Sequence, residues 1–425
     1  MLKFLRSSVM PTQVTPPEYK NNFLNLYLDM AWWGVTNGSI LAFLSIYATR
    51  LGATSFQLGL ITAAPALVNL LFTLPGNILT RRLPTKKATT LSNLITRLFY
   101  FLLIPLPVLL PAEPQIWVII GITLVMNIPG TIAAVMGNAF FAETVPIEWR
   151  AQVVGMRNTT FSATSMLVSF GAGMILDRMT FPLGYQVIFA IGFLGGMMSL
   201  VHLFLVKPLK QDFLAEAVSP SVKEELRAVE KYRFRTSLRN MVRPDVFKGP
   251  FGRVLVLVFS FYFAIFLVSP TYPLYQVNVL KMSDTTIGIG TAIYWVLFML
   301  VSLQNRSICK RISLKWMTGI GGFLTCVTLT LFLVSYQSWV YYLSQVFSGA
   351  AWGLISGSLL NYVFERIPDH DRPAYLSWYN LSYNGALLVA GLTAPLFVAW
   401  IGLFGAIVLS IVLRVIASIL LLKYG

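Results

Sequence analysis

The fold is decided by a stretch that occurs twice, as Glu143-Thr-Val-Pro146-Ile-Glu-Trp-Arg150 and as Glu365-Arg-Ile-Pro368-Asp-His-Asp-Arg372. Both copies carry Glu, Pro and Arg at the same spacing, and both are followed by a long apolar run. A basic turn also recurs in each half, first as Arg81, Arg82 and Lys86 and later as Lys310, Arg311 and Lys315. Two similar halves rich in apolar segments are typical of transporters built from internal repeats.

The composition is that of a membrane protein. Apolar residues make up 56% of the 425-residue chain, charged residues make up 11%, and the mean hydropathy is +0.71. A soluble protein would carry about 25% charged residues. Apolar runs of about 20 residues, enough to cross a hydrocarbon core of about 30 Å as a helix, recur throughout. We therefore predict an all-α polytopic membrane protein.

The formal net charge of +16 reflects membrane orientation rather than nucleic-acid binding. Loops on one side carry most of the Lys and Arg residues, whereas those on the other carry Arg50, Arg178 and Lys281. This asymmetry follows the positive-inside rule. It predicts cytoplasmic termini and a multi-pass protein of the cytoplasmic (inner) membrane, with the lipid bilayer as partner.

The repeat predicts twelve transmembrane helices in two six-helix bundles. A cytoplasmic N-terminal arm, 1–21, precedes the first bundle, 22–206. A hydrophilic cytoplasmic linker with an amphipathic helix, 207–253, leads to the second bundle, 254–425. The fourth span, about 115–142, is expected to be interrupted at residues 127–130 by Pro129 and Gly130.

The turn after the second span resembles the Gly-x-x-x-Asp-Arg-x-Gly-Arg-Arg signature of the major facilitator superfamily, with Thr80 and Pro84 replacing its Asp and second Gly. Its matching residues are Gly76, Arg81, Arg82, Lys86 and Lys87. The end of the fifth span, residues 171–178, is similar to the glycine motif of exporters in that superfamily. The resemblance implies the superfamily's fold, alternating access and, through the exporter-like motif, efflux.

A cytoplasmic gate is expected at the inner helix ends, where the repeated motif resembles acid–base clusters of the superfamily. Exposed carboxylate–guanidinium pairs contribute at most about 1 kcal/mol each, which suits contacts that must open easily. The alternative is ordinary helix-end charge near the headgroups. The predicted gate residues are Glu143, Arg150, Glu365, Arg372, Gly76, Arg81, Arg82, Lys310 and Arg311.

Charges within apolar spans are functional candidates because they are costly to bury. Asp29 and Arg157 fall in neighbouring spans, and their counterparts in the second half are uncharged. We expect Asp29 to carry a coupling proton with Arg157 as partner; a permanent structural ion pair is the alternative. For Arg97 and Arg414, snorkelling or a structural hydrogen bond is expected.

The expected substrate cavity combines amides, which bind neutral polar groups, with aromatic rings, which stack on apolar or sugar faces. The expected residues are Trp32, Trp33, Asn37, Asn127, Asn138, Asn158, Tyr262, Tyr294, Trp295, Trp352, Trp378, Tyr379 and Tyr383.

These features predict a monomeric, proton-coupled secondary transporter for a small neutral or amphipathic organic molecule. A lipid or lysolipid transporter of the same fold and a non-transporting receptor or scaffold are the alternatives. The chain has no Gly-x-x-x-x-Gly-Lys-Ser/Thr loop, and its two histidines, His202 and His370, are far apart in sequence. We therefore expect no enzyme activity, cofactor or metal.

Overall fold

Helices form nearly all of the described chain, which comprises residues 17–80, 84–208, 245–248, 250–367 and 372–424 of a computed structural model. The first half contains α2 (Pro17–Thr36), the π-helical turn η1 (Asn37–Leu41), α3 (Ala42–Arg50), α4 (Ser55–Thr80), α5 (Thr85–Leu102), α6 (Leu106–Leu109), α7 (Ala112–Thr144), α8 (Ile147–Arg178) and α9 (Leu183–Leu205). The second half contains α11 (Asp245–Lys248), α12 (Pro250–Phe266), α13 (Thr271–Leu274), the π-helical turn η2 (Tyr275–Val279), α14 (Asp284–Cys309), α15 (Leu314–Leu333), α16 (Ser338–Phe364) and α17 (Arg372–Tyr424).

These elements make twelve crossings within the described ranges. The segments α2, η1 and α3 form one crossing, and α12, α13 and η2 form another. The continuous α17 contains two crossings, because Gly402 adopts a φ of +74° in its middle and turns the chain back. A glycine tolerates this left-handed conformation because it has no Cβ. Eight of the described helices are long and apolar enough to cross a membrane. The predicted all-helical, twelve-span architecture is thereby confirmed.

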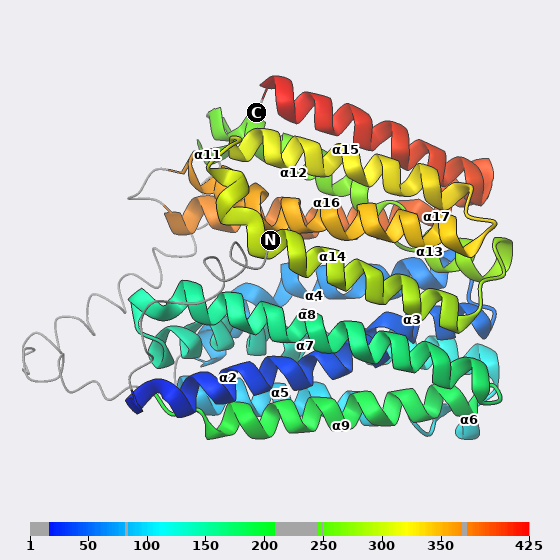
Figure 1. The fold of residues 1–425 in the computed structure, drawn as a ribbon, viewed down its shortest axis with the longest axis horizontal. Helices are drawn as coiled ribbons and strands as arrows, with labels where there is room; N and C mark the ends of the chain where they lie inside the picture. The colour runs from blue at the N-terminus through cyan, green and yellow to red at the C-terminus, as the bar shows by residue number, and fades with distance from the viewer. Residues whose placement is uncertain (1–16, 81–83, 209–244, 249, 368–371, 425) are drawn as a thin grey trace, which may run out of the picture.

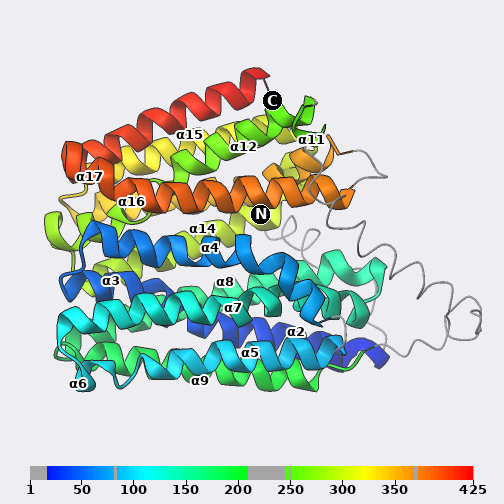
Figure 2. The same cartoon turned by 180° about the vertical axis from the view of Figure 1, so that it is seen from behind.

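The two halves lie side by side, with their helices running along a common direction (Figures 1 and 2). In the first half, α2 packs against α8 and α9, and α7 packs against α4 and α5. In the second half, α12 packs against α17, and α16 packs against α14 and α15. The start of α2 and the end of α17 lie at one end of the molecule, which the charge distribution assigns to the cytoplasm (Figure 1).

The halves meet along α8 with α14 and along α4 with α17. A Cβ placed on Gly59 would lie 2.5 Å from the carbonyl oxygen of Gly391, and one on Gly173 would lie 2.6 Å from that of Asp284. Both distances are shorter than a van der Waals contact, so only glycine permits this approach. Small residues allow close backbone packing between membrane helices in the same way.

The predicted interruption of the fourth span at residues 127–130 is wrong, because α7 continues through Pro129. Before the proline, Asn127 Nδ2 donates to the Thr123 oxygen at 2.6 Å, one turn earlier in α7. A proline has no N–H group, so the Val125 oxygen loses its helical partner while the helix continues.

Candidate functional site

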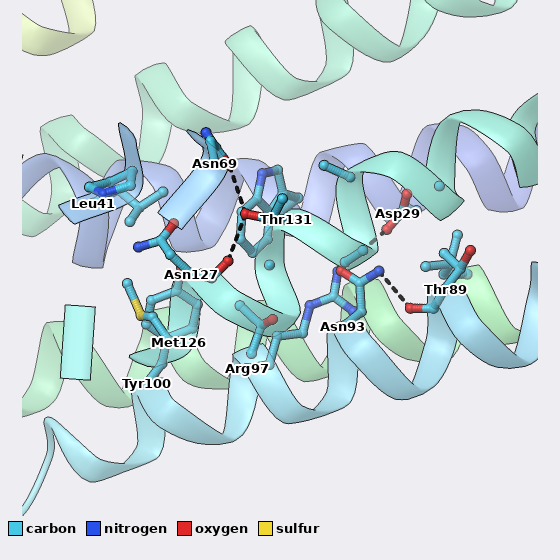
Figure 3. A pocket seen from close by; sticks show the side chains of 18 of the residues that line it. Asp29, Leu41, Asn69, Thr89, Asn93, Arg97, Tyr100, Met126, Asn127 and Thr131 are labelled. Carbon is cyan, nitrogen blue, oxygen red and sulfur yellow. Dashed lines mark hydrogen bonds and ion pairs between the residues drawn. The ribbon is translucent and has the colours of Figure 1, made fainter. Parts of the chain in front are cut away.

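A cavity of about 670 Å³ lies within the first half, between α2, α4, α5 and α7 (Figure 3). Its wall is rich in amide and hydroxyl side chains from α4, α5 and α7, among them Asn69, Asn93, Asn127 and Thr131. Thr131 Oγ1 lies 2.6 Å from Asn69 Oδ1, so a hydrogen bond ties α7 to α4 across the cavity. The volume falls within the range of about 300–1,000 Å³ that is usual for small-molecule sites.

A cluster of charged side chains forms one wall of this cavity. Asp29 of α2 is only 5% exposed. Its Oδ2 lies 3.7 Å from Arg157 Nη2, and its Oδ1 lies 4.0 Å from Arg97 Nη2. Ser199 of α9 donates to Asp29 Oδ1 at 2.5 Å and accepts from Arg97 Nη2 at 2.8 Å. The structure thus brings Asp29 and Arg157 together, as expected of neighbouring spans, and adds Arg97 and Ser199.

Arg97 and Arg157 also lie against aromatic rings. The Arg97 guanidinium carbon is 5.5 Å from the centre of the Trp33 ring, and that of Arg157 is 5.1 Å from the centre of the Phe141 ring. Arg97 makes the structural hydrogen bond expected of it, to Ser199 beside Asp29. Cation–π contacts of this kind contribute roughly 0.5–2 kcal/mol.

The predicted cavity residues of the first half divide into two groups. Trp33, Asn127 and Asn138 line the cavity. Asn37 instead donates to Ser165 Oγ of α8 at 3.1 Å. The other two do not line this cavity: Trp32 is half-buried on α2, and Asn158 is exposed on α8.

A second cavity, of about 400 Å³, lies mainly in the second half and contains Tyr294 and Trp352 in its wall. Leu41 and Ser45 line both cavities, so the two spaces are neighbours beside the turn η1. Gln276 and Gln345 supply amides to this wall.

The remaining predicted aromatic residues of the second half pack mainly against other rings. Tyr262 and Tyr379 place their hydroxyl oxygens 3.3 Å apart, and the rings of Tyr262 and Tyr383 are 4.6 Å apart. The ring of Trp295 lies 5.2 Å from that of Phe161, and the ring of Trp378 lies 5.7 Å from that of Phe247. These contacts place the five residues in packed aromatic clusters.

At the inner end of the first half, Glu143 and Arg150 contact other groups in this state. Glu143 accepts a short hydrogen bond from the Thr85 hydroxyl. Arg150 donates to the carbonyl oxygens of Ala142 at 2.8 Å and Val145 at 3.1 Å. Arg150 therefore satisfies carbonyl groups at the C-terminal end of α7, where a helix leaves acceptors free.

The inner end of the second half is described in part. Glu365 Oε2 lies 3.9 Å from Arg366 Nη1, and the Arg366 guanidinium carbon lies 3.7 Å from the centre of the Tyr362 ring. Lys310 and Arg311 are exposed. Gly76 lies within α4, whereas Arg81, Arg82 and the side chain of Arg372 are outside the described residues.

A network that the sequence did not predict joins the two halves at the outer end. Asp284 Oδ1, at the start of α14, accepts from Arg50 Nε at 3.1 Å, Arg50 Nη2 at 2.9 Å and the Tyr185 hydroxyl at 3.0 Å. Asp177 of α8 accepts from the backbone N–H groups of Asp284 at 2.9 Å and Thr285 at 3.0 Å. A carboxylate that binds the first N–H groups of a helix is well placed with respect to the helix dipole.

Hydrogen bonds between the two halves lie at the outer end and in the middle of the molecule. Contacts between the halves extend from the Arg50–Asp284 pair to the middle of the molecule, where Asn69 Nδ2 donates to Asn384 Oδ1 at 3.2 Å. These contacts hold the outer ends of the two halves together.

Two paired bundles, a cavity among the helices of the first half and hydrogen bonds that join the halves at the outer end are the architecture of a transporter. The sequence matches the family model of the Major Facilitator Superfamily over residues 30–283 and again over residues 254–424. The chain belongs to the Major Facilitator Superfamily. This result confirms the resemblance in sequence. No curated protein matches the chain significantly in sequence.

Solved structures of this superfamily share the fold. A D-xylose–proton symporter matches with a TM-score of 0.70 and 15% identity, covering 95% of this chain and 97% of that one. A POT family transporter in complex with a thioalcohol-conjugated peptide matches with a TM-score of 0.71 and 13% identity, covering 94% and 95%. The nucleoside transporter NupG matches with a TM-score of 0.65 and 13% identity, covering 95% and 98%. As a superfamily member the chain is a multi-pass membrane protein and a transporter, not an enzyme.

Proposed function

We propose that this superfamily member moves a small neutral or amphipathic organic molecule by proton-coupled alternating access, with Asp29 as the proton-carrying group. The observation that carries this proposal is the position of Asp29 in the wall of the cavity, 5% exposed and held by Ser199. A buried acid beside a substrate space is the arrangement that a proton relay requires.

The remaining acidic residues of the described helices are less suited to carry the coupling proton. Glu113, Glu148 and Glu365 are exposed near helix ends, and Asp177 is exposed at the outer end of α8. Glu143, the second choice for coupling, is half-buried at the inner end of α7 and accepts a hydrogen bond from Thr85. Asp284 is engaged in the outer network. Asp29 therefore combines burial with access to the cavity.

The cavity chemistry supports an organic substrate. Amide groups from α4, α5 and α7 provide donors and acceptors, while Trp33 and Tyr100 provide aromatic surface. Some structural neighbours carry D-xylose with protons or nucleosides, according to their descriptions. We propose that the chain works as a monomer in the cytoplasmic membrane, since each chain has its own cavity.

A lipid-like substrate is the second candidate. It is favoured by an apolar groove of about 290 Å³ between α8 and α14, where Leu167 and Phe170 are 61% and 43% exposed. An acyl chain would fit such a surface at the junction of the two halves. Export, which the exporter-like end of α8 favours, belongs to the same proposal.

The test begins with a thermal-shift screen of purified protein, because a ligand that binds the folded state raises its apparent stability. Ligands found in this way are then followed in proteoliposomes with and without a pH gradient. Asp29→Asn should abolish gradient-driven accumulation while leaving substrate exchange intact, and Glu113→Gln, an exposed acid at the outer end, should behave as wild type.

A normal response to the pH gradient in Asp29→Asn would refute its role in coupling. Loss of folding in that variant would favour a structural ion pair instead. Binding without flux of any ligand would favour the receptor alternative, and flux of lysolipid alone would favour the second candidate.

A further inference from the structure

The charged cluster beside the cavity has more cationic than anionic groups. Two guanidinium groups, of Arg97 and Arg157, face the single carboxylate of Asp29 at 4.0 Å and 3.7 Å. Arg97 is only 3% exposed, and the Arg157 side chain is 23% exposed. When all three are ionised, the cluster holds one uncompensated positive charge in a site where burying charge is costly.

Several hydrogen-bonding atoms of this cavity also have no partner among the described residues. They include three guanidinium nitrogens and two hydroxyl oxygens that are shielded from solvent: Arg97 Nε and Nη1, Arg157 Nε, Thr89 Oγ1 and Thr123 Oγ1. All four residues line the same space. A buried polar group without a partner costs about 1–3 kcal/mol, so a ligand group that reached these atoms when the side chains adjust would recover part of that cost. Figure 3 shows Arg97 and Thr89 from α5 around this space with Asp29.

We propose that Arg97 and Arg157 bind an oxyanion, a carboxylate or phosphate carried by the organic substrate, and that Asp29 takes up the coupling proton as the oxyanion binds. This inference rests on the proposed coupling function and narrows the proposed substrate to an amphipathic organic anion, in place of a neutral molecule. A guanidinium group presents parallel N–H donors that match the geometry of carboxylate and phosphate oxygens. The ring of Trp33, stacked near Arg97, offers the apolar part of such a substrate a flat surface.

Protonation of Asp29 and binding of the oxyanion are linked by competition for the same cations. Ionised Asp29 partly neutralises the charge of the two guanidinium groups. When Asp29 is protonated, both guanidinium groups can pair with the oxyanion of the substrate instead. The charged or titratable groups that face Asp29 are Arg157 from α8, Arg97 from α5 and His202 from α9, whose Nδ1 lies 3.0 Å from Asn25 Oδ1. One proton with one monoanion carries no net charge, so flux of a monocarboxylate should not respond to membrane potential.

The test uses four probes that share a ring or an oxyanion: benzoate, phenyl phosphate, inorganic phosphate and benzamide. Thermal shifts of the full-length protein are measured at mildly acidic and mildly alkaline pH. Benzoate or phenyl phosphate should act at a concentration at least about tenfold below that of benzamide in acid, a ratio equivalent to about 1.4 kcal/mol. This preference should shrink at alkaline pH.

The variants separate the roles of the charged groups. Arg97→Gln should remove the preference and Arg97→Lys should weaken it, whereas Arg306→Gln, an exposed cation on α14, should leave it unchanged. Asp29→Asn should keep the preference at both pH values, and His202→Gln should keep the wild-type pH dependence. If Arg97→Gln does not fold, the Arg97→Lys and Asp29→Asn measurements decide the question.

Equal shifts by benzamide and the organic oxyanions, or no shift by either, would overturn the inference. Equal effects of inorganic phosphate and phenyl phosphate would overturn its substrate part, because the site would then serve a free anion. Loss of gradient-driven flux in Asp29→Asn without any oxyanion preference would reject the oxyanion site and keep proton coupling. An oxyanion preference in a protein whose flux ignores the pH gradient would reject the coupling function instead.

Discussion

Replacing Asp284 by Asn should open the outer end of the transporter. Asp284 is the hub of the outer network, where its Oδ1 accepts two hydrogen bonds from Arg50 and one from Tyr185. The Arg50 and Asp284 side chains are 25% and 9% exposed, so solvent screens the pair only in part. The substitution removes the negative charge and keeps one acceptor oxygen.

The size of the effect follows from these contacts. Hydrogen bonds to charged groups contribute about 1.5–3 kcal/mol each, but an Asn oxygen retains part of this and partial exposure reduces it further. We expect a loss of about 1–2 kcal/mol from the outward-closed state. Such a change lowers the ratio of inward-open to outward-open molecules roughly five- to thirty-fold.

Distances across the outer end can measure this shift. Spin labels at the exposed positions Thr180 and Asn278, in a protein lacking Cys309 and Cys326, report the separation of the halves. Asp284→Asn should enrich the long-distance population, and Glu113→Gln, the same acid-to-amide change outside the network, should not. An unchanged distance distribution in Asp284→Asn would refute the assignment of this network as the outer gate.

Three further results are expected. Gly173→Val should favour outward-open molecules and slow transport, because the new side chain would meet the backbone of α14, whose nearest atom lies 2.6 Å from the Cβ position. Gly171→Ala is the control, because nothing lies within 4 Å of its Cβ position. Unimpaired transport in Gly173→Val would contradict this prediction. Glu143→Gln and Arg150→Ala should shift cysteine labelling toward inward-open states, and unchanged labelling in both would leave only their helix-end contacts. Arg414→Met should lower the melting temperature markedly, because three buried carbonyl oxygens lose the donor that Arg414 provides. A buried acceptor without a donor costs about 1–3 kcal/mol of stability. A wild-type melting temperature would argue against a structural role of Arg414.

The architecture was predictable because its sequence signals extend over whole segments. These signals are the lengths of the apolar runs, the repeated motifs and the distribution of basic residues among the loops. Asp29 was recognisable because an acid within an apolar span is rare and costly. Arg97 was not placed beside it, since sequence does not give the rotation of a helix in a bundle, and a long side chain reaches far from its backbone. Ser199 gave no signal, because one hydroxyl on a small-residue face resembles ordinary helix packing.

Charges at helix ends were harder to interpret than charges within spans. Arg50 and Asp284 sit where polar residues are common in any membrane protein, so only their partnership across the two halves reveals a role. Aromatic residues were ambiguous for a related reason. Tyr262 and Tyr383 were expected to line the substrate cavity, yet their rings pack against each other at 4.6 Å. A sequence pattern does not distinguish a ring that faces a cavity from one that faces another ring.

The side chains around Asp29 all come from one bundle: α2, α5, α8 and α9. Rotation of one bundle against the other as a rigid body preserves every distance inside each bundle. Rocking by itself therefore leaves the neighbours of Asp29 unchanged and alters only which side of the membrane supplies its water. Coupling between the proton and the substrate therefore requires the substrate itself to enter the charged cluster. There an anionic substrate would serve as the second counter-ion of Arg97 and Arg157 within an otherwise rigid bundle.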